Sequence, residues 1–259
     1  MSSSNCVYST SIVVIDLNTQ RDFCLPDGAY PVENVATLVP ALEQVMNWVR
    51  RNNIPVVSSI DSHREAELSQ SGVMRYAVDG SDGQRKIDVT KMPERINVQV
   101  DNTLSVPLDL FQSFQQVIFR QRGKDLMSNP KADRFLTQLN TDEFVVVGNV
   151  VEAAVRSVTL GLIARGKSVT LVPEACGHWE SEAADLAFRL CVAKGVQLCG
   201  LDELMQRDLK KPRKVVRVSE SSSDEEEDSF DRHDDRHEDR HSPRSAGRLS
   251  GSRSNAKLQ

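Results

Sequence analysis

Short runs of β-branched and aliphatic residues alternate along this chain with stretches whose apolar positions recur every three or four residues. The run at 11–16 is almost continuously apolar and ends in an acid, which is typical of a strand buried inside a parallel sheet. Similar short runs predict the remaining strands at 55–60, 116–119, 143–147, 168–172 and 196–198.

Helical periodicity separates several of these strands. It is clearest at 35–51, and it recurs at 152–165, 179–193 and 201–206, where Gly166 and Gly195 end the second and third helices. The alternation predicts an α/β fold with three α/β/α layers around a six-stranded, mostly parallel, Rossmann-like sheet. Sites in such sheets lie at the carboxyl ends of the strands.

The pattern changes at about residue 209. The segment 210–217 is basic, 219–228 consists only of serines and acidic residues, and Arg-His pairs recur after it. Apolar residues are too few there to offset the entropy of ordering the chain. We therefore expect one folded domain at 1–208 and a disordered, charged tail at 209–259.

Charge and composition narrow the possible partners. The chain has 259 residues and a net charge of −5, of which the body at 1–208 carries −6 and the tail +1. An acidic body argues against nucleic-acid binding, except weakly through the basic stretch 210–217. No apolar run approaches the roughly 20 residues that span a bilayer, and no signal-peptide pattern opens the chain, so no membrane partner is expected. The five cysteines form no CxxC pair, which favours a reducing cytoplasm.

Common nucleotide-binding and serine-hydrolase motifs are missing from the sequence. However, the segment Ile15 to Cys24, followed by Pro26-Asp27-Gly28-Ala29, resembles the first-strand motif of the isochorismatase-like cysteine hydrolases, which include nicotinamidases. The resemblance extends over much of 10–200. Its other segments are 59–63, 79–86, 128–130, 145–148, 155–166 and 172–177.

The resemblance implies a cysteine nucleophile at a helix start, with an aspartate on the first strand and a lysine after the third. A thiolate would attack an amide carbonyl, the aspartate would shuttle the proton, and backbone N–H groups would hold the oxyanion. Asp16 retains the aspartate, but Arg120 falls at the lysine position, with Lys124 as a possible substitute. The nucleophile position is Ala154, whose methyl group cannot attack a carbonyl.

The same resemblance implies a binding cleft and a metal site. We expect the cleft to be lined by Phe23, Tyr76, Gly148, Val150 and Val151. No cofactor is required for the chemistry above. The Asp-x-His metal pair is present as residues 61 and 63, but a tyrosine stands where a further histidine would complete the site.

Asp61 and His63 could therefore hold a divalent metal only weakly, because two protein ligands are too few for a stable site. A strand-end carboxylate beside an exposed histidine is the plainer interpretation of this pair.

Three functions remain open. The first is a pseudoenzyme that binds a small ligand in its cleft or serves assembly, with homo-oligomers implied by the resemblance. The second is a cysteine-independent hydrolase that cleaves a vinyl ether with Asp16 as general acid. The third is a phospho-regulated interaction protein acting through serines beside the acidic run 224–228.

Overall fold

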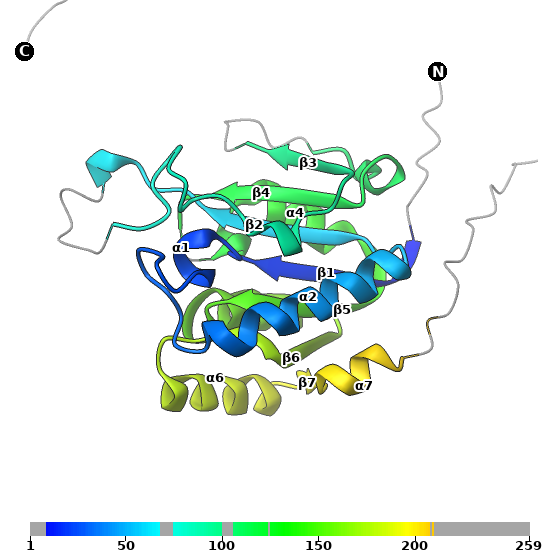
Figure 1. The fold of residues 1–259 in the computed structure, drawn as a ribbon. Helices are drawn as coiled ribbons and strands as arrows, with labels where there is room; N and C mark the ends of the chain where they lie inside the picture. Colours follow the sequence, from blue (N-terminus) through cyan, green and yellow to red (C-terminus); the bar gives the residue numbers. More distant parts are fainter. Residues whose placement is uncertain (1–8, 68–74, 100–105, 124, 208, 210–259) are drawn as a thin grey trace, which may run out of the picture. The chain divides into compact units, whose positions relative to one another are not determined.

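A computed structural model describes residues 9–67, 75–99, 106–123, 125–207 and 209. Its centre is one seven-stranded sheet in the order β3-β4-β2-β1-β5-β6-β7, in which neighbouring strands pair parallel throughout (Figure 1). The strands are β1 (Ser9–Leu17), β2 (Val56–Asp61), β3 (Arg95–Val98), β4 (Gln116–Gln121), β5 (Asn140–Asn149), β6 (Val169–Gly177) and β7 (Gln197–Leu198).

Helices cover both faces of the sheet and complete the three layers. Alternate residues of β1 point to opposite faces of the sheet. Val13 and Ile15 pack into the core on one face, and Ile12 and Val14 pack into the core on the other. The first core contains α4 (Pro130–Gln138), α5 (Arg156–Ala164) and α6 (Ser181–Ala193). The second contains α1 (Arg21–Cys24), α2 (Val35–Arg51) and α7 (Leu201–Met205).

The predicted α/β/α class is confirmed, and each of the six predicted strands is present. The sheet has one more strand than expected, β3, at its edge. β3 has only four residues with alternating exposure, so its sequence lacks the apolar run that marks the buried strands.

Five other elements differ from the prediction. The helix α4 was not predicted, although the Asn129 side chain caps its start by accepting from the Lys131 N–H and Pro130 occupies its first turn. Three short 3-10 turns also went unpredicted: η1 (Asp88–Thr90), η2 (Leu110–Gln112) and η3 (Leu126–Ser128). The helix expected from residue 152 opens instead with a π-helical turn, η4 (Val151–Val155), before α5.

Several expectations fall outside the described residues. Lys124 is one of them, and the tail from residue 210, with its basic stretch and its serines, is another. Leu209 is described and packs, partly buried, against the second core. Within the described part of the chain, no helix is both long and apolar enough to cross a membrane.

Candidate active site

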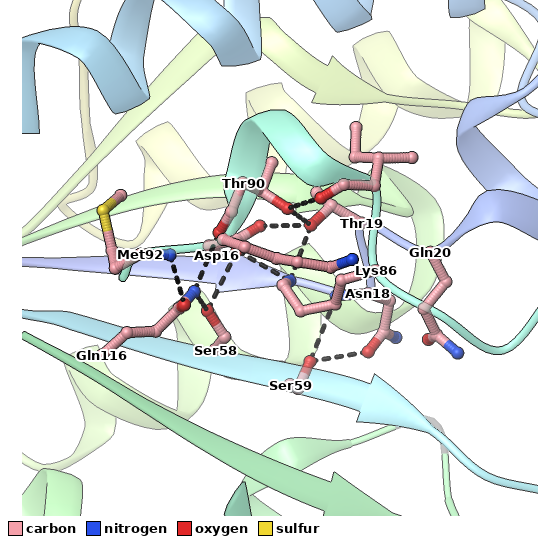
Figure 2. Close-up of polar contacts among 12 residues, drawn as sticks. Asp16, Asn18, Thr19, Gln20, Ser58, Ser59, Lys86, Thr90, Met92 and Gln116 are labelled. Atoms are coloured by element: carbon pink, nitrogen blue, oxygen red, sulfur yellow. Dashed lines mark hydrogen bonds and ion pairs between the residues drawn. The ribbon is translucent and has the colours of Figure 1, made fainter. Parts of the chain in front are cut away.

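Asp16 lies near the carboxyl end of β1, the middle strand of the sheet, and its side chain is fully buried. Both carboxylate oxygens accept hydrogen bonds from hydroxyl groups. Thr19 Oγ1 donates to Oδ1 at 2.8 Å, and Ser58 Oγ of β2 donates to Oδ2 at 2.9 Å (Figure 2). The carboxylate is therefore held in one orientation by groups from two neighbouring strand ends.

The cation that neutralises this carboxylate is Lys86. Its Nζ lies 2.7 Å from Asp16 Oδ2 and also donates to Thr19 Oγ1 at 2.7 Å. Only 5% of Lys86 and none of Asp16 is exposed. A buried charge of either sign is costly unless it is paired and hydrogen-bonded, and here each group satisfies the other.

Backbone pairing explains how a lysine outside the strands reaches Asp16. The segment that carries Lys86 forms an antiparallel bridge with Gln20, just after β1. The Ile87 N–H donates to the Thr19 carbonyl at 2.9 Å, and Gln20 Nε2 donates to the Gln84 carbonyl at 2.9 Å. These bonds fix the loop across the end of the first strand.

A second set of hydrogen bonds joins this cluster to Thr90, Gln116 and Met92, as Figure 2 shows. The hydroxyl of Thr90 lies 2.9 Å from that of Thr19. Gln116 Nε2 donates to Ser58 Oγ at 2.8 Å and to the Thr90 carbonyl at 2.9 Å, while its Oε1 accepts from the Met92 N–H at 2.9 Å. Every polar atom around Asp16 in this network therefore has a partner within the protein.

The expectation that Arg120 takes the lysine position is corrected by this geometry. Arg120 lies on β4, and β2 separates that strand from β1. Its Nε is buried and makes no hydrogen bond within the described residues, whereas Lys86 contacts Asp16 directly. The sequence analysis missed Lys86 because it sought the lysine near the carboxyl end of a predicted strand, whereas Lys86 lies in a loop. The available signal was its place at the end of the resembling segment 79–86.

The position expected for the nucleophile lies where β5 passes into the first helical turn. The chain leaves the strand through a cis peptide between Asn149 and Val150 and continues into η4, which contains Ala154. Ala154 is 3% exposed and lines a cavity. Ala154 therefore lies beside this cavity, in the first helical turn after β5.

The cavity beside Ala154 is small, at about 20 Å³, which is room for about one water molecule. Aromatic rings close it: Tyr30 stacks on Trp179 at 4.3 Å between centroids, and Phe23 and Tyr76 lie 5.4 Å apart. Of the five predicted cleft residues, Phe23, Tyr76 and Val150 are among those that line it. The full lining consists of Asn18, Phe23, Asp61, Tyr76, Val150, Ala153, Ala154 and Trp179.

The other two predicted cleft residues are buried behind this lining. Val151 is 1% exposed and belongs to the first core. Gly148 has φ +106°, and a Cβ at this position would lie against the carbonyl oxygen of Leu17. Gly148 therefore serves the close approach of β5 to β1.

No cysteine in the described part of the chain offers a ready thiolate. All four described cysteines are buried and free, and burial raises the pKa of each. Burial raises the pKa of Cys24, whose Sγ accepts from Asn149 Nδ2 at 3.0 Å, to about 12. Because the thiolate is the nucleophile, a thiol with this pKa is inert near neutral pH.

The Asp61–His63 pair does not make a metal site in this arrangement. Among the residues that the structure describes, no group of three or more His, Cys, Asp and Glu side chains could hold an ion. Asp61 Oδ1 accepts from Gln121 Nε2 at 2.7 Å, and the His63 ring packs edge-on against Tyr76 at 5.0 Å. Burial, with a contribution from Asp61, raises the pKa of Tyr76, which keeps the phenol neutral. The residues present therefore do not fit a zinc ion.

The structure is thus a three-layer α/β protein with a parallel sheet and a buried Asp16–Lys86 pair near the carboxyl end of its middle strand. The family model of the isochorismatase domain matches residues 10–203. The chain therefore belongs to the isochorismatase family.

Solved structures share this fold at low sequence identity. Pyrazinamidase of Pyrococcus horikoshii in complex with zinc is 18% identical, with a TM-score of 0.60, and the match covers 73% of this chain and 99% of that one. An isochorismatase-like hydrolase from Alkaliphilus metalliredigens is 17% identical, with a TM-score of 0.58 and coverage of 76% and 98%. PnC1 from L. infantum in complex with nicotinate is 18% identical, with a TM-score of 0.59 and coverage of 76% and 96%. None of the curated proteins matches the sequence significantly.

Proposed function

We propose that this protein is a pseudoenzyme of the isochorismatase family, which cannot hydrolyse amides by the cysteine route and acts by binding. The observation that carries the proposal is Ala154 at the helix start beside the cavity. Asp16 and Lys86 keep an ion pair, but a proton shuttle without a nucleophile performs no acyl transfer. Deleting the nucleophile of a hydrolase removes roughly 10³–10⁶ of its rate.

The geometry argues less well for a hydrolase that uses Asp16 as general acid. Both oxygens of Asp16 accept from hydroxyls, and Oδ2 also faces Lys86, so a proton on this carboxyl would have to displace one of these donors. Asp16 is also fully buried and lies outside the set of residues that line the cavity. A general acid must instead lie within hydrogen-bond reach of the substrate.

Binding is the function that the cavity still allows. Its aromatic walls favour a small planar molecule, and Asn18 and Asp61 are the polar side chains of the lining. Because the cavity holds about 20 Å³, such a ligand enters only when the ring of Trp179 or Tyr76 moves. We also place the protein in the cytoplasm, a proposal supported by four free cysteines among the described residues.

Turnover by the purified full-length protein tests the proposal. The panel contains nicotinamide, pyrazinamide and isochorismate, with Asp16→Ala as the background. We expect wild type to equal this background. We expect Ala154→Cys to gain amide hydrolysis of about 10² over wild type, because it restores a nucleophile at the helix start. Ala154→Ser is the matched control, since a hydroxyl without a general base attacks poorly.

Clear wild-type turnover that Asp16→Ala abolishes, while circular dichroism shows the variant to be folded, would instead establish an aspartate-dependent enzyme and refute the proposal. The binding part has its own readout. Trp179 lines the cavity, whereas the other tryptophan, Trp48, is 2% exposed within the second core. We expect nicotinamide or nicotinate to quench the fluorescence of wild type but not of Trp179→Phe. An unchanged signal with every planar amide and acid tested would argue against this ligand class.

A further inference from the structure

Four aromatic rings beside the cavity contact one another in a closed circuit, and we call Phe23, Tyr30, Tyr76 and Trp179 the aromatic cluster. In addition to the two contacts given above, the centroids of Tyr30 and Tyr76 lie 5.5 Å apart, and those of Phe23 and Trp179 lie 6.4 Å apart. Phe23, Tyr76 and Trp179 line the cavity. The rings come from α1 and from three loops, so the hydrogen bonds of the sheet do not fix their positions.

The carboxylate of Asp22 on α1 joins two of these loops to that helix. Its Oδ2 accepts from the Ala77 N–H at 2.7 Å, and its Oδ1 accepts from the Ala29 N–H at 3.1 Å. The backbone carbonyl of Asp22 also accepts from the Tyr30 N–H at 3.0 Å. Ala77 is fully buried and has φ +49°, so without Asp22 its N–H would lack an acceptor in a strained backbone conformation. The position of the neighbouring Tyr76 ring therefore depends on this carboxylate.

A second carboxylate, that of Glu152, holds the segment of Trp179. Glu152 belongs to η4, and its Oε1 accepts from the N–H groups of Trp179 and Glu180, both at 2.9 Å. These bonds join the loop after β6 to the helical turn that contains Ala154. Hydrogen bonds to an ionised acceptor are stronger than those between neutral groups. Both bonds of Glu152 end on one oxygen, whereas the side-chain bonds of Asp22 use both of its oxygens.

We propose that Asp22 and Glu152 are positioning residues that hold the aromatic cluster closed, and that Asp22 thereby controls how fast a planar ligand enters the cavity. The entry role rests on the binding function proposed above, whereas the closure of the cluster does not. A cavity of about 20 Å³ cannot hold an aromatic ring, so a ligand must enter through an open state of the cluster. Weakening the bonds of Asp22 raises the population of that state, because it releases the segments of Tyr30 and Tyr76.

Quenching of tryptophan fluorescence by acrylamide in the full-length protein tests the closure without any ligand. The difference between each protein and its Trp179→Phe form gives the signal of Trp179, because Trp48 stays buried in the second core. We expect Asp22→Asn to raise the quenching constant of Trp179 at least about twofold, since the amide Nδ2 donates and leaves one N–H without an acceptor. Asp82→Asn is the matched control. It makes the same change in an exposed carboxylate that pairs with Arg21, and it should leave the constant unchanged.

Two variants of Glu152 separate its role as acceptor from any general effect of a substitution. Glu152→Gln keeps a carbonyl oxygen that accepts from both N–H groups, whereas Glu152→Ala keeps none. We expect Glu152→Ala to raise the quenching constant of Trp179 and Glu152→Gln to leave it near the wild-type value. Urea unfolding checks that all proteins are compared well below their unfolding transitions. This pair still decides the closure if Asp22→Asn does not fold.

Stopped-flow quenching by nicotinamide tests the entry role of Asp22. We expect the association rate constant to rise about tenfold in Asp22→Asn, because losing one hydrogen bond makes the open state more populated. Equal rates in wild type and variant would overturn the entry role and leave the binding function standing. If nicotinamide quenches neither protein while acrylamide reveals opening, the closure is supported and binding of this probe fails. Unchanged acrylamide quenching in both Asp22→Asn and Glu152→Ala, or equal opening in Glu152→Gln and Glu152→Ala, would overturn the proposed closure.

Discussion

At the scale of single residues, the pair Asp16–Lys86 combines a candidate chemical role with a structural one. Lys86 lies 67 residues from its hydrogen-bond partner Thr19, so the contact joins distant parts of the chain. If Ala154 occupies the nucleophile position, as we propose, the proton-transfer role of the pair has no covalent step to serve. Its structural role remains, because either charge alone would be buried without compensation.

This structural role predicts a large and non-additive effect on stability. Asp16→Asn or Lys86→Met alone should each lower the free energy of unfolding by about 3–5 kcal/mol, since each leaves one buried group without its partner. The double variant should lose clearly less than the sum of the two. Urea unfolding of the four proteins completes the cycle. Lys91→Met, which breaks the solvent-exposed pair with Asp88, is the control and should change little. Additive losses from the two single variants would contradict the coupling.

The same pair shows where reasoning from sequence stops at this scale. Asp16 could be placed because a buried strand ends in an acid, a local pattern that needs no knowledge of the fold. Lys86 could not be placed, because it reaches the site from an irregular loop through its bridge with Gln20. Arg120, like Asp16, lies near the end of a strand, but β2 separates the two strands in the sheet. The local pattern of apolar residues does not reveal the order of the strands.

At the scale of elements, the passage from β5 into the helix that follows it depends on Gly148. The residue has φ +106°, in the left-handed region, and its missing side chain lets β5 approach the carbonyl of Leu17 on β1. β1 and β5 share the most extensive pairing in the sheet, from Ser9–Asn140 to Leu17–Gly148. A side chain here would therefore disturb both the central strands and the helix start at Ala154.

We predict that Gly148→Ala destabilises the protein far more than Gly166→Ala does. Both glycines have a positive φ, but nothing lies within 4 Å of a Cβ at Gly166, which ends α5. Gly166→Ala should therefore cost only the conformational strain of about 1–2 kcal/mol. Gly148→Ala adds a clash with the backbone and should cost more than about 3 kcal/mol or prevent folding. Thermal unfolding measures both, and equal losses would refute the role assigned to Gly148.

Element prediction succeeded where burial produces a strong period. The helix expected at 35–51 matches α2 at both ends, since its apolar stripe is long and regular. β3 and α4 were missed for the opposite reason: the first is a four-residue edge strand, and the second has four buried residues in a polar sequence. The π-helical turn at Val151–Val155 follows from how the chain leaves β5, which no periodic pattern encodes.

At the scale of the whole molecule, the described residues of the two cores extend from Ile12 to Leu209. Family membership agrees with this extent, because the isochorismatase domain match covers 10–203. The three-layer architecture could be predicted because strand and helix alternate with few interruptions. The packing of Trp179 and Tyr76, which line the cavity, against Tyr30 could not, because it depends on contacts between three separate loops.

From the last core residue that the structure describes, Leu209, we predict where the folded domain ends. A chain of residues 1–209 should unfold with the same free energy as the full-length protein, because it contains every core residue that the structure describes. Ending the chain at 208 removes Leu209, which packs partly buried against the second core, and should cost up to about 1 kcal/mol. Urea unfolding at matched ionic strength compares the three chains. A large loss in 1–209 would show that the tail contributes to folding, and the tail would then have to be counted as part of the domain.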